Sequence, residues 1–222
     1  MAGLVSDDTE TLHPMKRPVQ RIAFYLGIAL LVGAGFMAGR EMLPRAGWQA
    51  ALPLSQTEGT ASIGEPFTLV DHTGKMVNET DFRGRFMLVF FGFTYCPDAC
   101  PTALTIMAEA LDIIGPAAER VVPVFITVDP ERDTPEQLNM YVRHFHPSLV
   151  GLTGSAEQLA AATKAFRVYY AKVKNEDSAD GDYEMEHTSN VYLMGPNGKF
   201  LTHFSGHTTN PKTMAAGILD VL

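Results

Sequence analysis

The stretch FGFTYCPDACPTAL, Phe91–Leu104, contains both cysteines of this 222-residue chain. Cys96 and Cys100 are separated by three residues, and a proline follows each of them. The run RFMLVFF at 85–91 comes just before and predicts a strand that is covered on both faces. The residues from 102 to 114 carry a helical apolar stripe that ends at a glycine. Two thiols therefore lie where a buried strand passes into a helix.

Strands and helices alternate along the rest of the chain, which predicts an α/β sandwich around a mixed sheet. The strand–cysteine–helix junction narrows this class to a thioredoxin-like fold with inserted loops. The other predicted elements are a hairpin at 66–84, strands at 121–128, 149–154, 169–174, 190–194 and 199–204, and helices at 135–145, from Ser155, and from 213.

The two prolines predict the shape of the cysteine segment. A residue before proline is pushed out of the α region, so Cys96 and Cys100 are both expected to be non-helical. The helix is then expected to begin at Pro101, a residue type favoured at the first helical position. The positive end of the helix dipole favours thiolate over thiol. Two activated sulfurs are expected at one partly exposed place.

Three kinds of chemistry fit this pair of cysteines. A structural role, as a disulfide staple or as two core residues, is one reading, although a staple across so short a loop constrains little. A redox dithiol is the second, although its usual spacing is C-x-x-C. The third is a soft-metal site for Cu(I) or Zn(II), which needs a further ligand such as histidine.

His187 is the best-placed of seven histidines to be that ligand. It lies in DYEMEHTSNVYLM, in a predicted loop just before a buried strand. In a thioredoxin-like sheet such a loop faces the cysteine segment, where the ring is either a metal ligand or a satisfied loop histidine. The other histidines have less suitable places. His13 lies on the far side of the apolar run at 22–39, His72 at a predicted turn, His144 and His146 at a predicted helix end, and His203 and His207 on either side of FSG.

The chain begins with a predicted membrane anchor. Residues 22–39, IAFYLGIALLVGAGFMAG, contain no charge. As a helix they would be about 27 Å long, close to the hydrocarbon thickness of a bilayer. We expect a short cytoplasmic leader at 1–21, the anchor at 22–39, a linker at 40–64 and the folded domain at 65–222. The expected location is the bacterial inner membrane, single-pass, with a cytoplasmic N-terminus and a periplasmic domain.

Net charge and missing motifs exclude several classes of function. The formal net charge of −8 repels phosphate backbones, so no nucleic-acid partner is expected. No P-loop, paired-carboxylate signature or Ser/His/Asp arrangement can be placed, so a hydrolase or kinase is unsupported.

Three blocks of this sequence resemble the SCO/SenC family of copper chaperones. FTYCPDACP at 93–101 agrees with the family pattern F-T-x-C-P-x-x-C-P, and VDPERDTPEQL at 128–138 and HTSNVYLMGPNGKF at 187–200 resemble two further blocks. The resemblance covers roughly residues 60–222. Two features depart from it: Glu184 and Glu186 make the histidine segment more acidic, and a polar insert, NEDSADGD, occupies 175–182.

The resemblance implies that Cys96, Cys100 and His187 bind copper, as Cu(I) or Cu(II), one ion per chain. It implies delivery to the dinuclear copper centre in subunit II of cytochrome c oxidase. Cys96 and Cys100 are also expected to form a redox disulfide that abolishes binding, because thiolate is the ligand. An upstream copper donor and a thioredoxin-like reductant are therefore expected as partners.

Two carboxylates are expected to support the site. Asp98 lies between the cysteines and is expected to cap the helix, or else to tune the charge of the thiols. Asp129 follows the strand at 121–128, at the edge of the sheet where sites gather, and is expected to support the cysteine loop.

Most of these expectations describe a carrier, not an enzyme. The enzymatic alternative is a thiol–disulfide reductase that keeps the cysteines of the oxidase subunit reduced, and it uses the same two thiols. A peroxidase of the same superfamily would share only the fold. His187 separates the readings, because a metal carrier requires it and dithiol exchange does not.

Overall fold

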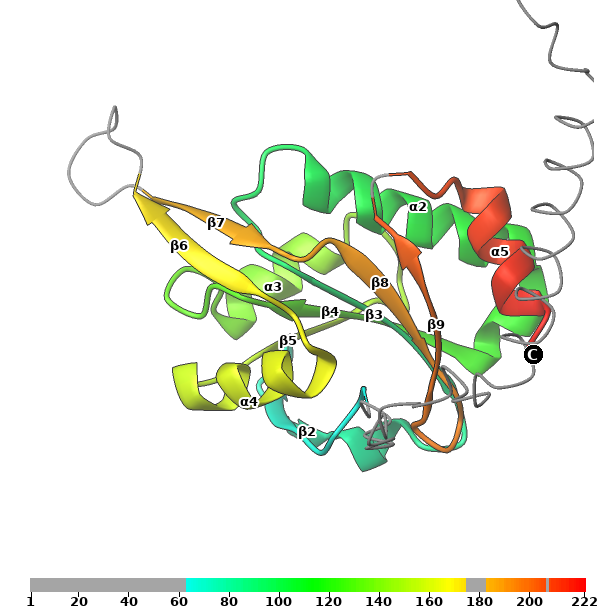
Figure 1. The fold of residues 1–222 in the computed structure, drawn as a ribbon, viewed down its shortest axis with the longest axis horizontal. Coiled ribbons are helices and arrows are strands. Elements are labelled where there is room, and N and C mark those ends of the chain that lie inside the picture. Colours follow the sequence, from blue (N-terminus) through cyan, green and yellow to red (C-terminus); the bar gives the residue numbers. More distant parts are fainter. Residues whose placement is uncertain (1–62, 175–182, 207) are drawn as a thin grey trace, which may run out of the picture. The chain divides into compact units, whose positions relative to one another are not determined.

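The computed structural model describes residues 63–174, 183–206 and 208–222, and seven strands of this part form one mixed sheet (Figure 1). Its strand order is β2-β1-β5-β4-β3-β8-β9. Strands β3, β4 and β5 run parallel, and the remaining neighbours in the sheet are antiparallel. The strands of this sheet are β1 (Thr68–Asp71), β2 (Met76–Asn78), β3 (Phe86–Gly92), β4 (Val121–Thr127), β5 (Val150–Thr153), β8 (Asn190–Met194) and β9 (Phe200–Ser205).

Helices cover both faces of this sheet. They are α2 (Ala99–Ile114), α3 (Pro135–Val142), α4 (Ala156–Phe166) and α5 (Pro211–Leu219), with short 3₁₀ turns η1 (Glu79–Phe82) and η2 (Gly115–Arg120). The hairpin β1–β2 and the capping box of Ser155 and Gln158 at α4 form as predicted. None of the helices in the described part is long and apolar enough to cross a bilayer. The predicted anchor at 22–39 and the insert at 175–182 lie outside the described residues.

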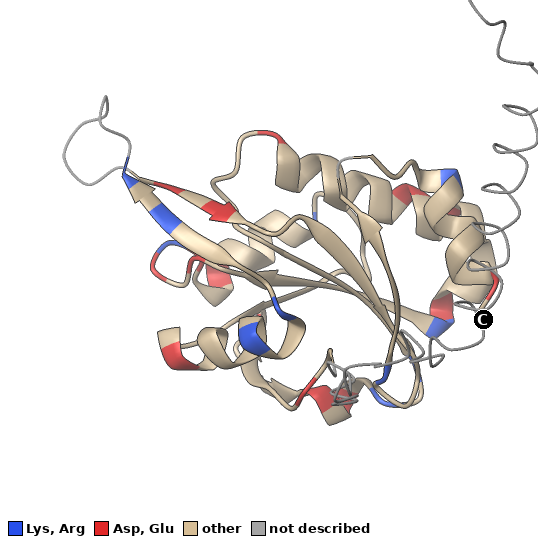
Figure 2. Cartoon of the chain, in the orientation of Figure 1, with Lys and Arg blue, Asp and Glu red and all other residues tan. Residues whose placement is uncertain are grey.

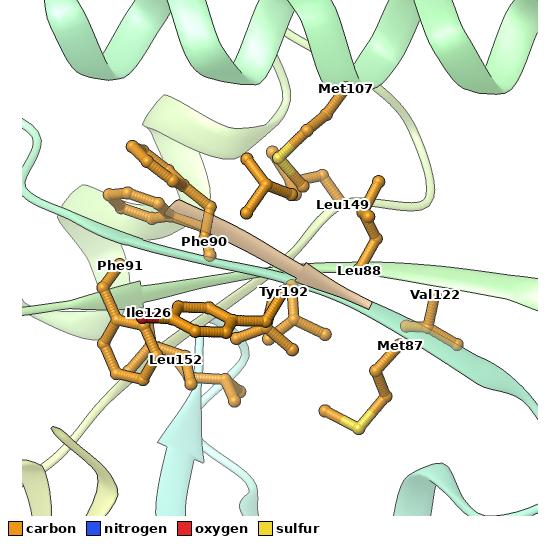
Figure 3. Packing of buried hydrophobic residues seen from close by; sticks show 14 of the residues in the cluster. Met87, Leu88, Phe90, Phe91, Met107, Val122, Ile126, Leu149, Leu152 and Tyr192 are labelled. Atoms are coloured by element: carbon orange, nitrogen blue, oxygen red, sulfur yellow. The ribbon is translucent and has the colours of Figure 1, made fainter. Parts of the chain in front are cut away.

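The central strands are buried on both faces, as their continuous apolar runs predict. Side chains alternate along β3, so that Phe90 packs on the face that α2 and α3 cover, and Phe91 on the face that α4 covers (Figure 3). The ring centroid of Phe91 lies 5.3 Å from that of Phe166 in α4. This two-sided core fixes the carboxyl end of β3, and the cysteine segment begins there.

One segment differs in type from the prediction. The segment Tyr183–His187 forms a strand, β7, where a loop was predicted. It pairs antiparallel with β6 (Tyr170–Lys174), and the two strands form a sheet of their own, separate from the seven-stranded one. The β6–β7 hairpin extends beyond the body of the domain, with basic residues on β6 and acidic residues on β7 (Figures 1 and 2).

Candidate metal and dithiol site

The cysteine segment connects the central strand β3 to helix α2. Its start is held to the sheet, because the amide of Val128 donates to the carbonyl of Gly92 at 2.8 Å. It then turns, with the amide of Cys96 donating to the carbonyl of Phe93 at 3.3 Å. The Cys96 side chain is half-buried, whereas Cys100 is fully buried. Neither cysteine forms a disulfide in this structure.

Helix α2 begins two residues earlier than the prolines predict. It starts at Ala99, so Cys100 is helical and the prediction of two non-helical cysteines is wrong for this residue. Pro101 falls in the first turn, where an amide hydrogen has no partner within the helix, so the proline costs no hydrogen bond. The steric bias against α conformation before proline is overcome by the burial of the Cys100 side chain.

The sulfur of Cys96 caps this helix. It accepts a hydrogen bond from the amide of Cys100 at 3.3 Å, which satisfies one of the free N–H groups at the helix start. Asp98 occupies the N-cap position, but its carboxylate makes no hydrogen bond to the backbone of the helix. It accepts only from the hydroxyl of Thr102, at 3.3 Å. The predicted capping role of Asp98 is therefore wrong, because the sulfur occupies that place.

His187 lies at the end of β7 and its ring reaches the buried cysteine. Its Nε2 is 3.5 Å from the Sγ of Cys100, although the two residues are 87 positions apart in the chain. Its Nδ1 lies 3.0 Å from the carbonyl oxygen of Thr188. A carbonyl can only accept, so Nδ1 carries the hydrogen and Nε2 of the neutral ring keeps a free lone pair. That lone pair faces the sulfur.

Two aromatic rings hold the imidazole in this orientation. The rings of Phe90 and Phe93 each have their centroid 6.0 Å from that of His187, and both contacts are edge-to-face. Phe90 comes from the strand before the cysteines and Phe93 from the cysteine segment itself. The histidine is thus packed against the same stretch of chain that carries its sulfur neighbour.

The two thiols have opposite acidities. A hydrogen bond from the Cys100 thiol lowers the pKa of Cys96 to about 5; burial opposes this shift, and hydrogen bonds from the amides of Cys100 and Asp98 add to it. The same sulfur–sulfur hydrogen bond, together with burial, raises the pKa of Cys100 well above its usual range. The pair therefore holds one proton at neutral pH, with the negative charge on the exposed sulfur.

A buried carboxylate that the sequence reasoning missed anchors the cysteine segment. Asp133 is fully buried and accepts from the amide of Thr94 at 3.0 Å and from its hydroxyl at 2.6 Å. The hydroxyl of Thr127, at the end of β4, donates to the same carboxylate at 2.6 Å. Burial raises the pKa of Asp133, and these hydrogen bonds oppose that rise.

Asp129, which was expected to support the cysteine loop, makes its side-chain contacts elsewhere. It is buried, forms an ion pair with Arg132 at 2.5 Å, and accepts from the hydroxyl of Tyr183 at 2.7 Å. Tyr183 begins β7, so Asp129 connects the end of β4 to the strand that carries His187. Its link to the cysteine segment runs through Arg132, whose guanidinium lies over the rings of Phe93 and Tyr95.

An open cleft of about 500 Å³ lies beside the exposed sulfur. It is lined by the cysteine segment on one side and by β7 on the other, including Cys96, Pro97, Glu184 and His187. A second hollow, of about 560 Å³, lies at the opposite ends of β3 and β4 and contains none of the predicted site residues. Of these two hollows, only the first gives a partner protein access to the Cys96 thiol.

The predicted ligands are close neighbours but do not enclose a common point. Across the described residues, no three His, Cys, Asp or Glu side chains are grouped tightly enough to hold a metal ion as they stand. The structure brings Cys100 to His187 and Cys96 to Cys100. A three-ligand site would require the cysteine segment to close further around the ion.

Fold and site together define a thioredoxin-like domain that has a dithiol and an imidazole at the carboxyl end of its central strand. Comparison with known proteins narrows the class: residues 55–222 match the SCO1/SenC family model, and the chain belongs to that family. It is 40% identical over 190 residues to an SCO2-like protein of Rickettsia felis, covering 86% of this chain and 92% of the relative.

Solved structures agree with this assignment. The structure of Bradyrhizobium japonicum ScoI with copper bound is 42% identical, with a TM-score of 0.67, and the match covers 72% of this chain and all of that one. BsSco, described as having a disulfide switch and as a member of the Sco family of cytochrome c oxidase assembly proteins, is 30% identical with a TM-score of 0.56. That match covers 72% of this chain and 91% of BsSco. The thioredoxin-like fold is therefore confirmed.

Proposed function

We propose that this protein is a copper carrier that binds one ion through Cys96, Cys100 and His187. The observation that carries the proposal is the free lone pair of His187 Nε2, which faces the Sγ of Cys100 at 3.5 Å. Solved relatives carry copper, and the family includes assembly proteins of cytochrome c oxidase. The proposed acceptor is the dinuclear copper site of oxidase subunit II.

The donor set suits this cargo. Two thiolates and one imidazole are soft to intermediate ligands, which favour Cu(I) and tolerate Cu(II). Cys96 is already a thiolate at neutral pH, whereas Cys100 must release its proton when the metal binds. Binding would draw the two sulfurs and the imidazole together, and the open cleft leaves room for that movement.

The exposure of the site suits transfer. Cys96 is half-exposed at the edge of the cleft, so an acceptor thiolate can approach the ion before the donor ligands leave. Cys100, which is fully buried, and His187 beside it would hold the ion until the acceptor has supplied its own ligands. Transfer then proceeds by ligand exchange toward the more complete coordination shell, without catalysis by this chain.

The dithiol also requires a reductant. If Cys96 and Cys100 form a disulfide, both thiolate ligands are lost. A partner dithiol, such as that of a thioredoxin-like protein, can reduce it: the partner gives two electrons and two protons and leaves as a disulfide. An upstream copper donor then loads the reduced site. We place this exchange outside the cytoplasm, on a domain that the segment at 22–39 tethers to the bacterial inner membrane.

A second candidate function is thiol–disulfide exchange with the cysteines of the acceptor. The low pKa of Cys96 favours it, because an exposed thiolate beside a protonated buried thiol is the arrangement of an attacking and a resolving cysteine. This activity needs no histidine ligand. The two functions can share the site but differ in their need for His187.

Anaerobic titration of the reduced full-length protein with Cu(I), against a chromophoric chelator, tests the proposal. We expect one ion per chain for the wild type and for the control His203→Ala, whose histidine lies on β9. We expect His187→Ala to lose tight binding. Equal copper binding by His187→Ala and wild type would exclude the proposed site and leave thiol–disulfide exchange as the function of the two cysteines.

A further inference from the structure

Arg132 lies between the two elements that carry the proposed copper ligands. On one side its guanidinium carbon is 5.8 Å from the ring centroid of Phe93 and 4.8 Å from that of Tyr95, both in the cysteine segment. On the other side it is 3.9 Å from the ring centroid of Tyr183, the first residue of β7. Its Nε donates to Asp129, and its Nη1 donates to the carbonyl of Tyr183 at 3.1 Å.

The strand that Arg132 contacts lies outside the seven-stranded sheet. A two-stranded hairpin is marginally stable in water, and β6–β7 is not hydrogen-bonded to the seven-stranded sheet. At its His187 end the amide of Thr188 donates to the carbonyl of Tyr169, which ties the hairpin to itself, and the His187 ring packs on Phe90 and Phe93. Toward its Tyr183 end the hairpin is joined to the domain by Arg132 and Asp129, and by an exposed ion pair of Lys172 with Glu131.

The geometry of β7 links the position of Tyr183 to the position of His187. Side chains two and four residues apart lie on one face of a strand, so Tyr183, Met185 and His187 share a face of β7. Tyr183 rests on Arg132, Met185 is buried, and His187 meets the cysteine segment. Glu184 and Glu186 point the other way and are exposed. The contacts of Tyr183 therefore also set the distance between the inward-facing side chains of β7 and the two thiols.

We propose that Arg132 is a positioning residue that locks β7 onto the cysteine segment and so sets the distance between the His187 and Cys100 ligands. The inference rests on the proposed copper site. The planar guanidinium of Arg132 lies close to the rings of Tyr95 and Tyr183. Its Nη2 is buried with no hydrogen-bond partner in the described part of the chain, so this side of the group contributes packing and not a hydrogen bond. Lysine can keep the charge beside Asp129 but has no planar group to lie between the rings of Tyr95 and Tyr183.

Copper affinity and a double-mutant cycle with His187 test this role. We expect Arg132→Ala to weaken Cu(I) binding roughly 10- to 100-fold, the range for losing a partner that orients a metal ligand. Arg132→Lys should fall between Arg132→Ala and wild type. The control Lys174→Ala removes an exposed cation of the same hairpin and should change affinity less than about twofold. In the His187→Ala background, Arg132→Ala should have no further effect, because the ligand that it positions is gone.

Hydrogen exchange of the metal-free protein provides a second readout. We expect faster exchange of the β7 amides in Arg132→Ala, with unchanged exchange in β3 and β4, which would also establish that the variant is folded. Two outcomes would overturn the inference: unchanged β7 exchange, or equal effects of Arg132→Ala with and without His187. If the wild type binds no copper, the proposed function fails, and the exchange measurement still decides whether Arg132 fixes β7.

Discussion

The carboxylate of Asp133 holds Thr94 by both its amide and its hydroxyl, at 3.0 and 2.6 Å, and is itself fully buried. Thr94 stands two residues before Cys96, and Thr127 ends the neighbouring strand and donates to the same carboxylate. Asp133 thus joins the cysteine segment to β4 at the carboxyl ends of two parallel strands. The position of the thiols depends on a residue that lies 33 positions beyond the second cysteine.

Replacing Asp133 should destabilise the domain. Asp133→Ala leaves the amide and hydroxyl of Thr94 and the hydroxyl of Thr127 without their acceptor, and a buried unsatisfied donor costs about 1–3 kcal/mol. We expect a loss on the order of 3 kcal/mol in the free energy of unfolding, measured by urea denaturation. Asp133→Asn should lose less, because its carbonyl oxygen can still accept.

The control for this comparison is Asp112→Ala, which removes an exposed carboxylate from α2 and should change stability by less than about 0.5 kcal/mol. Stability of Asp133→Ala equal to that of the control would mean that the hydrogen bonds to Thr94 and Thr127 are not what fixes the cysteine segment.

Asp98 should matter far less than its place between the cysteines indicates. Its carboxylate makes no backbone hydrogen bond at the start of α2, so Asp98→Ala is expected to cost less than about 0.5 kcal/mol of unfolding free energy. Thr134→Ala is the matched comparison, because the Thr134 hydroxyl accepts from the amide of Gln137 at the start of α3. That change should cost about 1 kcal/mol. Equal losses from both variants would show that Asp98 does cap its helix.

The central strands and most helices follow from the sequence because their signals are local. Continuous apolar runs define β3 and β4, and Ser155 with Gln158 marks the start of α4. The cysteines and the histidine could be selected because sulfur and imidazole chemistry is visible in residue types. Their contact was expected from the thioredoxin-like class, in which the loop before this strand faces the cysteine segment, and the structure places β8 next to β3.

Strand β7 and the two supporting residues were not predicted, for different reasons. Tyr183–His187 does alternate apolar and acidic side chains, which is a strand pattern, but two glutamates in five residues weaken it. Asp133 and Arg132 lie in a charged stretch that looks like a solvated turn. Their burial depends on tertiary contacts with Thr94 and Tyr183, which are distant in sequence. No local pattern distinguishes a buried carboxylate from a surface one.

Gly92 gives Cys100 the space that it occupies. A Cβ on Gly92 would lie 2.8 Å from the Sγ of Cys100 and 2.8 Å from a ring carbon of Phe125. Gly92→Ala should therefore displace the sulfur and lower the free energy of unfolding by about 1–3 kcal/mol, as overpacking does. It should also weaken Cu(I) binding, measured by the chelator competition described above.

The comparison for Gly92→Ala is Gly74→Ala in the β1–β2 turn. Gly74 has a φ of +86°, and a Cβ there would meet nothing within 4 Å, so alanine adds backbone strain alone. It should lower stability without changing copper affinity. If both variants bound copper as the wild type does, close packing of Gly92 on Cys100 would have no part in forming the site.

The acidity of Cys96 should make it the reactive thiol. With a pKa of about 5, it is almost wholly thiolate at pH 7, and its alkylation by iodoacetamide should be nearly independent of pH from 6.5 to 8. Cys100 should resist alkylation over the same range, because its pKa is raised and its side chain is buried. Mass spectrometry of peptides from the reduced protein distinguishes the two sites. Preferential labelling of Cys100 would contradict the assigned charge distribution.

The same pair of thiols should make the stability of the reduced protein depend on pH. Below pH 5, Cys96 is protonated in both the folded and the unfolded chain and contributes nothing to the pH dependence. Between pH 5 and the pKa of Cys96 in the unfolded chain, near 9, the unfolded chain binds one proton more than the folded chain. The free energy of unfolding should therefore rise with pH over this range. Above pH 9 the raised pKa of Cys100 reverses the sign, because the folded chain then retains the proton.

Urea denaturation of the reduced protein and of Cys96→Ser, at pH values from 5.5 to 8.5, measures this contribution. Carboxylates and histidines elsewhere contribute equally to both proteins, so the difference between the two curves isolates the thiol. We expect the wild type to gain stability relative to Cys96→Ser as the pH increases across this range. Parallel curves would mean that Cys96 titrates alike in the folded and unfolded chains, and that its sulfur does not cap α2 as a thiolate.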